Sequence, residues 1–167
     1  MTVKHYDWSA YHANVRPNKV AIRDLSTNKE LTYLELNTRA NKLAGWLQSQ
    51  GIKKGDRVAI LSQNCAEFFE LEFACAKIGA IELPLNWRLT KPELEYILKD
   101  STPHTLIYDA MFLDISIELM KDCSINSSLQ IDSDDLQSEY EEALNSSDGS
   151  HEVVESFQED LIMIMYT

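Results

Sequence analysis

The side chains that most often carry catalysis or bind metals are present in this sequence, but their spacing builds no complete site. The four histidines are His5, His12, His104 and His151. None of them forms an HxxxH or HExxH pair, so the sequence predicts no zinc centre. The five glycines form no GxGxxG or GxxxxGKS/T loop for a phosphate, and no GxSxG turn presents a serine nucleophile. We therefore expect neither a catalytic residue nor a metal ligand from motifs within the chain.

The three cysteines, at positions 65, 75 and 123, are too far apart to form a CxxC motif. Cys65 and Cys75 fall in an apolar helical stretch, where cysteine behaves as a small hydrophobic side chain, so no thiol enzyme is predicted. Unpaired cysteines are typical of a reducing compartment, and the first residues lack the apolar run of a signal peptide. No stretch approaches the roughly 18 apolar residues of a membrane span. We therefore expect a cytoplasmic protein that does not cross a membrane.

Any site must be positioned by the alternating strands and helices that the apolar pattern predicts. A hairpin is expected at 20–25 and 30–32, and single strands at 57–62, 80–83, 105–108, 129–131 and 161–166. Helices are expected to begin at the capping boxes Thr32–Glu35 and Thr90–Glu93, at an Asn64 cap and at about residue 111. This alternation predicts an α/β fold, a mostly parallel sheet with helices on both faces. The last strand is entirely apolar and should be the most buried, and ligands in such sheets bind beyond the carboxyl ends of the strands.

Composition and charge exclude several classes of protein. The chain of 167 residues is 44% hydrophobic and 25% charged, as expected for a single globular domain. Its net charge of −12 argues against binding to nucleic acid or to an anionic membrane surface. The acidity is uneven, because Lys121 is the one basic residue among 15 acidic residues after position 107. We interpret residues 132–155 as an acidic surface excursion, with at most a marginal surface helix, within a subdomain that spans residues 1–167.

The order of several segments resembles that of one enzyme family. These segments are LTYLEL at 31–36, GIKKGDRVAI at 51–60, AKIGAIELPLNWRLT at 76–90 and ELEYIL at 93–98. They resemble the beginning of an acyl-adenylate-forming (AMP-binding) enzyme of the acyl-CoA synthetase group, to which luciferases and peptide-synthetase adenylation domains are related. The resemblance covers about residues 15–110, fades through the acidic stretch and resumes at 160–167. It implies that the chain is the N-terminal portion of the large domain of an acyl-CoA synthetase-like fold.

The resemblance also implies a reaction and two candidate site residues. The parent enzyme would activate a fatty or other apolar carboxylic acid with ATP and Mg²⁺, and then transfer the acyl group to coenzyme A. In the family, a strand like that at 161–166 leads into a Ser/Thr/Gly-rich loop that wraps the phosphates of ATP. Thr167 matches the entry of this loop. Arg88 follows an earlier strand and is a candidate contact for coenzyme A phosphates, with a local surface ion pair as the alternative. Its neighbour Trp87 either lines the ligand cleft or packs its ring.

The rest of that loop is not in the chain, so we expect this chain to bind none of these cofactors and to be inactive by itself. Two alternatives remain open. The parent could be an adenylating enzyme that loads a carrier protein, or the chain could be a non-catalytic interaction module that forms a homodimer through exposed apolar surface. The codons that follow Thr167 would discriminate between an enzyme and a stand-alone module.

Overall fold

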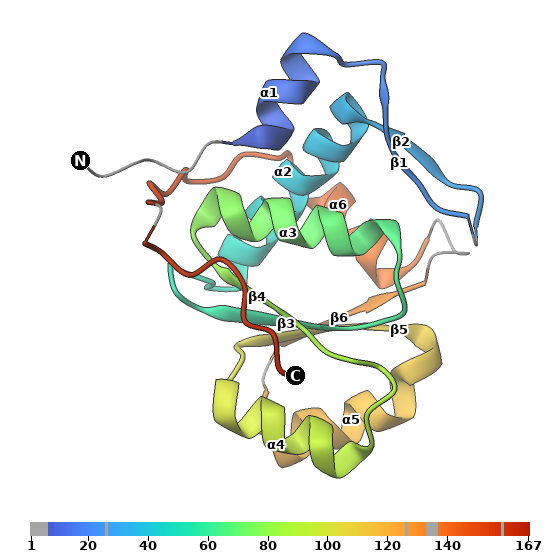
Figure 1. Cartoon of the computed structure of the whole chain (residues 1–167), viewed down its shortest axis with the longest axis vertical. Helices are drawn as coiled ribbons and strands as arrows, with labels where there is room; N and C mark the ends of the chain where they lie inside the picture. The colour runs from blue at the N-terminus through green and yellow to red at the C-terminus, as the bar shows by residue number, and fades with distance from the viewer. Residues whose placement is uncertain (1–6, 26, 126, 133–136, 158) are drawn as a thin grey trace.

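A four-stranded parallel sheet forms the centre of the molecule, and we describe it from a computed structural model (Figure 1). The structure describes residues 7–25, 27–125, 127–132, 137–157 and 159–167. The strands lie in the order β4 (Ile81–Pro84), β3 (Arg57–Leu61), β5 (Thr105–Asp109) and β6 (Ser127–Ile131). All three neighbouring pairs are parallel, which confirms the predicted fold class.

Helices cover both faces of this sheet, as the alternation of strands and helices predicts (Figure 1). One face carries α2 (Tyr33–Ser49), α3 (Ala66–Ile78) and α6 (Glu139–Ser146). The other carries α4 (Lys91–Ser101) and α5 (Leu113–Asp122), which follows a short 3₁₀ turn at Ala110–Phe112. Helix α1 (Trp8–Val15) packs on α2, and the antiparallel hairpin of β1 (Val20–Arg23) and β2 (Glu30–Thr32) lies beside it.

The alternating side chains of the central strands produce two hydrophobic cores. Val58 and Ile60 of β3 pack with α2, α3 and α6 in what we call the α3-side core. Ala59 and Leu61 of the same strand point to α4 and α5 and belong to the α4-side core. Both sets are fully buried, because a parallel strand covered by helices on two faces has no side open to water.

Local hydrogen bonds set the ends of the helices. Thr32 and Glu35 form the expected capping box at the start of α2, and Gly79 ends α3 in the left-handed conformation at φ 70°. The prediction that Asn64 caps α3 is wrong by one residue. Cys65 holds the N-cap position with an extended backbone and makes no side-chain capping bond. The helix therefore begins at Ala66.

The expectation that residues 161–166 form the most buried strand is wrong. They run beside β4 with a single bridge, between Glu82 and Met163, and form no regular strand. Leu161 is 64% exposed and Met165 70% exposed. Apolar composition alone does not bury a segment, which also needs elements on every side. Within the described ranges, β4 is the strand that pairs with this segment, and no strand pairs with its outer edge.

The acidic stretch contributes to the core more than expected. The prediction of at most a marginal surface helix is wrong for α6, since Tyr140, Ala143 and Leu144 are buried in the α3-side core. Their spacing of three and four residues forms one apolar face, while Glu139 and Glu142 stay exposed on the other. Residues 133–136 of the proposed excursion lie outside the described residues. No described helix is both long and apolar enough to cross a bilayer.

Candidate functional site

The loop that leaves β4 forms one wall of the candidate site at the carboxyl edge of the sheet. Leu85 is buried and donates its backbone N–H to Ile60 O of β3 at 2.9 Å. The loop then turns on Asn86, whose Oδ1 accepts from the backbone of Arg88 at 3.1 Å and whose backbone O accepts from Leu89 at 3.0 Å. These bonds fix where the residues after the strand lie.

The first turn of α4 continues this wall. The backbone N–H of Thr90 donates to Glu93 Oε2 at 2.7 Å, which completes the predicted capping box. Hydrogen bonds from the Thr90 side chain and backbone lower the pKa of Glu93. A carboxylate that stays ionised therefore lies at the start of this helix.

Arg88 lies exposed on this loop with its guanidinium above the ring of Trp87, 4.2 Å from the ring centre. Trp87 is half-buried against the α4-side core and near Phe112, so its ring packs, as expected for an amphipathic side chain. The expected alternative, a local ion pair, is not formed by Arg88 with any described residue. Stacking on Trp87 leaves the planar face of the cation held and its N–H groups turned to solvent, a suitable arrangement for a phosphate.

Thr167 forms the opposite wall. The hydroxyl of Tyr166 donates to Asp100 Oδ2 of α4 at 2.5 Å, and its ring packs against the α4-side core. Thr167 therefore lies exposed in a groove of about 520 Å³. The groove is lined by Asn86, Leu89, Pro92, Glu93, Tyr96, Ile97, Tyr166 and Thr167.

The two residues implied by the resemblance thus occupy different positions at this edge. Thr167 shares the groove with Asn86 of the β4 exit loop, whereas Arg88 is not among the lining residues. The groove lining contains one ionisable acid, Glu93, and no lysine or arginine. Its hydroxyl groups can donate single hydrogen bonds to a phosphate, but no side chain of the lining can neutralise the phosphate charge.

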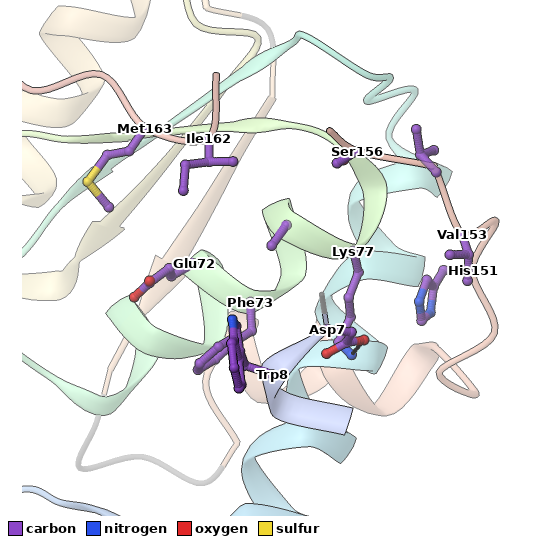
Figure 2. Close-up of a pocket in the computed structure, with 12 residues that line it drawn as sticks. Asp7, Trp8, Glu72, Phe73, Lys77, His151, Val153, Ser156, Ile162 and Met163 are labelled. Atoms are coloured by element: carbon purple, nitrogen blue, oxygen red, sulfur yellow. Dashed lines mark hydrogen bonds and ion pairs between the residues drawn. The ribbon is translucent and has the colours of Figure 1, made fainter. Parts of the chain in front are cut away.

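A second pocket of about 140 Å³ lies beside α3, on the face of the sheet opposite α4 (Figures 1 and 2). It lies between the start of α1, the outer face of α3 and residues 151–156 and 162–163, and Lys77 enters it from α3. The Lys77 ammonium already binds Asp7 Oδ2 at 2.6 Å and Asn37 Oδ1 at 2.9 Å. Because its charge is matched, this pocket has no free cation for an anionic ligand. Across the described parts of the chain, no three His, Cys, Asp or Glu side chains gather to hold a metal.

Sequence reasoning missed the carboxyl group of Glu82, which lies within β4 and is 2% exposed. Burial and the charge of Glu72 raise the pKa of Glu82 to about 8. One signal was available in the sequence, because an acidic residue lies within an apolar run whose composition predicts a strand buried on both faces. A perturbed carboxyl group of this kind is a candidate for a role beyond packing.

Three comparisons with known proteins agree with this geometry. The model of the family "AMP-binding enzyme" matches residues 9–167. The chain is 36% identical over 168 residues to a long-chain-fatty-acid–CoA ligase of Mycobacterium tuberculosis, which covers 99% of this chain and 33% of the ligase. It is 38% identical over 104 residues to a fatty acid–[acyl-carrier-protein] ligase of Streptomyces coeruleorubidus, covering 62% of this chain and 20% of that protein.

Solved structures give the same result. A Mycobacterium tuberculosis fatty acyl CoA synthetase superposes with a TM-score of 0.84 at 34% identity, over 96% of this chain and 32% of that one. The inhibitor-bound N-terminal domain of FACL13 from the same organism superposes with a TM-score of 0.86 at 34% identity, over 99% of this chain and 41% of the other. The chain spans about one third of the length of the Mycobacterium tuberculosis ligase, although nearly all residues of this chain are matched.

Proposed function

The chain belongs to the AMP-binding enzyme family, and on this premise we propose that it is the N-terminal part of an ATP-dependent ligase that joins a carboxylic acid to coenzyme A. The substrate class we propose is a fatty or other apolar acid, in keeping with the names of the similar ligases. The proposal places the enzyme in the cytoplasm, in accord with three free cysteines. The net charge of −12 of this chain argues against a nucleic-acid partner for this part of the enzyme.

One observation carries the proposal at the level of the site. Thr167 lies at the carboxyl edge of the sheet, in a groove whose other wall is the exit loop of β4. Ligands of open α/β sheets bind at this edge, because the strand ends leave a crevice between neighbouring loops. A loop that continues from Thr167 would begin at this crevice.

The residues present do not by themselves make a site for ATP or Mg²⁺. Thr167 offers one hydroxyl, and the ionisable residue beside it in the groove is Glu93, whose charge would repel a phosphate. We therefore expect the chain alone to be inactive.

Coenzyme A fits one residue of this chain better. Arg88 presents a guanidinium that stacks on Trp87 and is exposed to solvent, so it can approach a phosphate without losing an internal ion pair. Its role would be to bind and orient a phosphate of the thiol substrate through bidentate hydrogen bonds.

The coenzyme A role predicts a selective effect in the ligase that carries this segment. Arg88→Ala should raise the KM for coenzyme A about tenfold, as expected for loss of one charge-assisted contact, and leave the KM for ATP unchanged. Arg23→Ala is the matched control, since Arg23 is an exposed arginine that pairs locally with Glu30. Equal KM values for coenzyme A in both variants would mean that Arg88 is a surface residue that does not contact coenzyme A.

The inactivity of the isolated chain is tested by calorimetric titration with MgATP. We expect no saturable binding in the micromolar range, because the chain contains one residue of the phosphate loop. Low-micromolar binding would contradict the proposal that the nucleotide site needs residues beyond this chain.

A carrier-protein acceptor is the second candidate, favoured by the 38% identity to a fatty acid–[acyl-carrier-protein] ligase. Acyl transfer by the ligase to coenzyme A, assayed against transfer to a phosphopantetheinylated carrier protein, discriminates between the two. If the codons after Thr167 do not continue into a Ser/Thr/Gly-rich loop, the remaining alternative is the non-catalytic module that forms homodimers.

A further inference from the structure

The buried carboxyl group of Glu82 has no function in the proposed reaction, and its surroundings are unusual. Its neighbour Leu83 belongs to the α4-side core, so Glu82 points to the opposite face of the sheet, toward α3. Its Oε2 is buried, with no hydrogen-bond partner among the described residues. Leaving an acid of this kind without a partner is costly when it is charged and much less so when it is neutral.

Burial and the charge of Glu72 favour the neutral form of Glu82. Helix α3 presents Glu72 and Cys75 to it, and burial raises the pKa of both side chains. The neighbouring strand β3 presents Val58 at the paired position, and the segment 161–167 presents Met163, neither of which titrates. The nearby cation of α3, Lys77, is bound to Asp7 in the adjoining pocket. No described cation therefore pairs with a Glu82 carboxylate.

The backbone of the same residue holds the segment that ends in Thr167. The Glu82 N–H donates to Ile162 O at 3.0 Å, and the Ile164 N–H donates to Glu82 O at 2.9 Å. Ile162 and Met163 also line the pocket that Glu72 enters from α3 (Figure 2). The segment is thus attached to β4 at a residue whose buried carboxyl group needs water when it ionises.

We propose that Glu82 is a proton-dependent positioning residue for residues 161–167. While its carboxyl group is neutral, the segment stays paired with β4, and ionisation of the group favours release of the segment, so that water reaches the carboxylate. The importance of this device for nucleotide binding rests on the function proposed above, because the segment leads to Thr167. The attachment itself does not depend on that function.

The direction of the pH effect follows from the two environments of the group. With the segment attached, the pKa of Glu82 is about 8, and with the segment released it returns toward its ordinary value of 4.5. Attachment is therefore fully favoured below pH 4.5, weakens as the pH rises toward 8, and changes little above that pH.

Amide hydrogen exchange of Ile164 in the 167-residue chain measures this attachment directly. After correction for the intrinsic exchange rate, we expect protection to fall at least about tenfold between roughly pH 5.5 and 8, and then to level off. The amide of Ile107 in the central strand β5 is the internal reference, because it reports global unfolding, and its protection should stay well above that of Ile164 at every pH. A constant protection of Ile164 across this range would overturn the proposal.

Three variants separate the proton effect from simple packing. Glu82→Gln keeps the shape without the titrating group and should give pH-independent protection. Glu72→Gln removes the neighbouring charge and should move the upper end of the transition to lower pH. Tyr166→Phe removes the bond to Asp100 and should weaken attachment equally at every pH. A Glu82→Gln chain that keeps the native pH dependence contradicts the proposal.

The carboxyl ¹³C titration of Glu82 in the native chain keeps the proposal testable if Glu82→Gln does not fold. We expect a midpoint well above the ordinary value of 4.5, coupled to loss of Ile164 protection. A midpoint near that ordinary value with Ile164 still protected would overturn the proposal. Neither measurement uses ATP or coenzyme A, so a negative result leaves the proposed ligase function untouched, and failure of that function leaves this result standing.

Discussion

Glu70 and Glu82, two of the glutamates buried on the α3 side of the sheet, have different surroundings. Glu70 of α3 is 0% exposed and has partners on both oxygens, with Arg39 Nε at 2.7 Å and the Tyr140 hydroxyl at 2.8 Å. Glu82 of β4 is 2% exposed and faces another acid, Glu72. The first lies under α2 and α6, and the second lies at the open edge of the sheet.

The contrast shows how partners decide what a buried acid does. Burial raises the pKa of Glu70, but the charge and hydrogen bond of Arg39 oppose this effect. Arg39 also binds Glu141 of α6 through two nitrogens, at 2.9 and 2.6 Å, so the network ties the acidic stretch to the core. Glu82 has no such network, so it does not hold neighbouring elements together and instead makes the attachment of the segment at β4 sensitive to pH.

The largest effect is predicted for loss of the ion pair between Arg39 and Glu70. Arg39→Met should lower the free energy of unfolding by about 3–5 kcal/mol at pH 7, because Glu70 is left buried without its cation. Urea denaturation measures the change. Arg23→Met is the control and should cost less than about 1 kcal/mol, since its pair with Glu30 is exposed. A loss for Arg39→Met as small as that of the control would mean that the network does not stabilise α6.

A smaller loss is expected when one donor of the network is removed. Tyr140→Phe leaves Glu70 Oε2 without its hydroxyl partner while keeping the ring in the core, and should cost about 1–3 kcal/mol. Tyr96→Phe, at an exposed tyrosine of α4, is the matched control. If the two variants unfold at the same urea concentration, the hydroxyl of Tyr140 contributes nothing and the contrast with Glu82 weakens.

The smallest effect has the opposite sign. Glu82→Gln should raise the free energy of unfolding by about 1–2 kcal/mol at pH 8, because the unfolded chain no longer gains from ionising this group. The gain should vanish near pH 4.5, where the acid is neutral in the folded chain and half-ionised at most when unfolded. Glu142→Gln on the exposed face of α6 is the control. A stabilisation that persists unchanged at low pH would indicate packing and not proton linkage.

Short-range features of this molecule were predictable from the sequence, because they depend on residues a few positions apart. The capping boxes at Thr32 and Thr90 and the left-handed end of α3 at Gly79 are local hydrogen-bond patterns. The parallel sheet followed from the alternation of strands with helices. The family followed from the order of motifs and is supported by the match over residues 9–167.

Burial and charge pairing were decided by contacts between distant segments, which composition does not reveal. The apolar run at 161–166 is exposed because its outer edge has no described partner strand. The acidic helix α6, in contrast, packs on the core because Arg39 of α2 and Glu70 of α3 provide hydrogen-bond partners there. The resemblance selected Thr167, but the groove beside it exists because Tyr166 reaches Asp100. A sequence determines which side chains need a partner, and the tertiary structure determines whether a partner or water is within reach, since that depends on positions far apart along the chain.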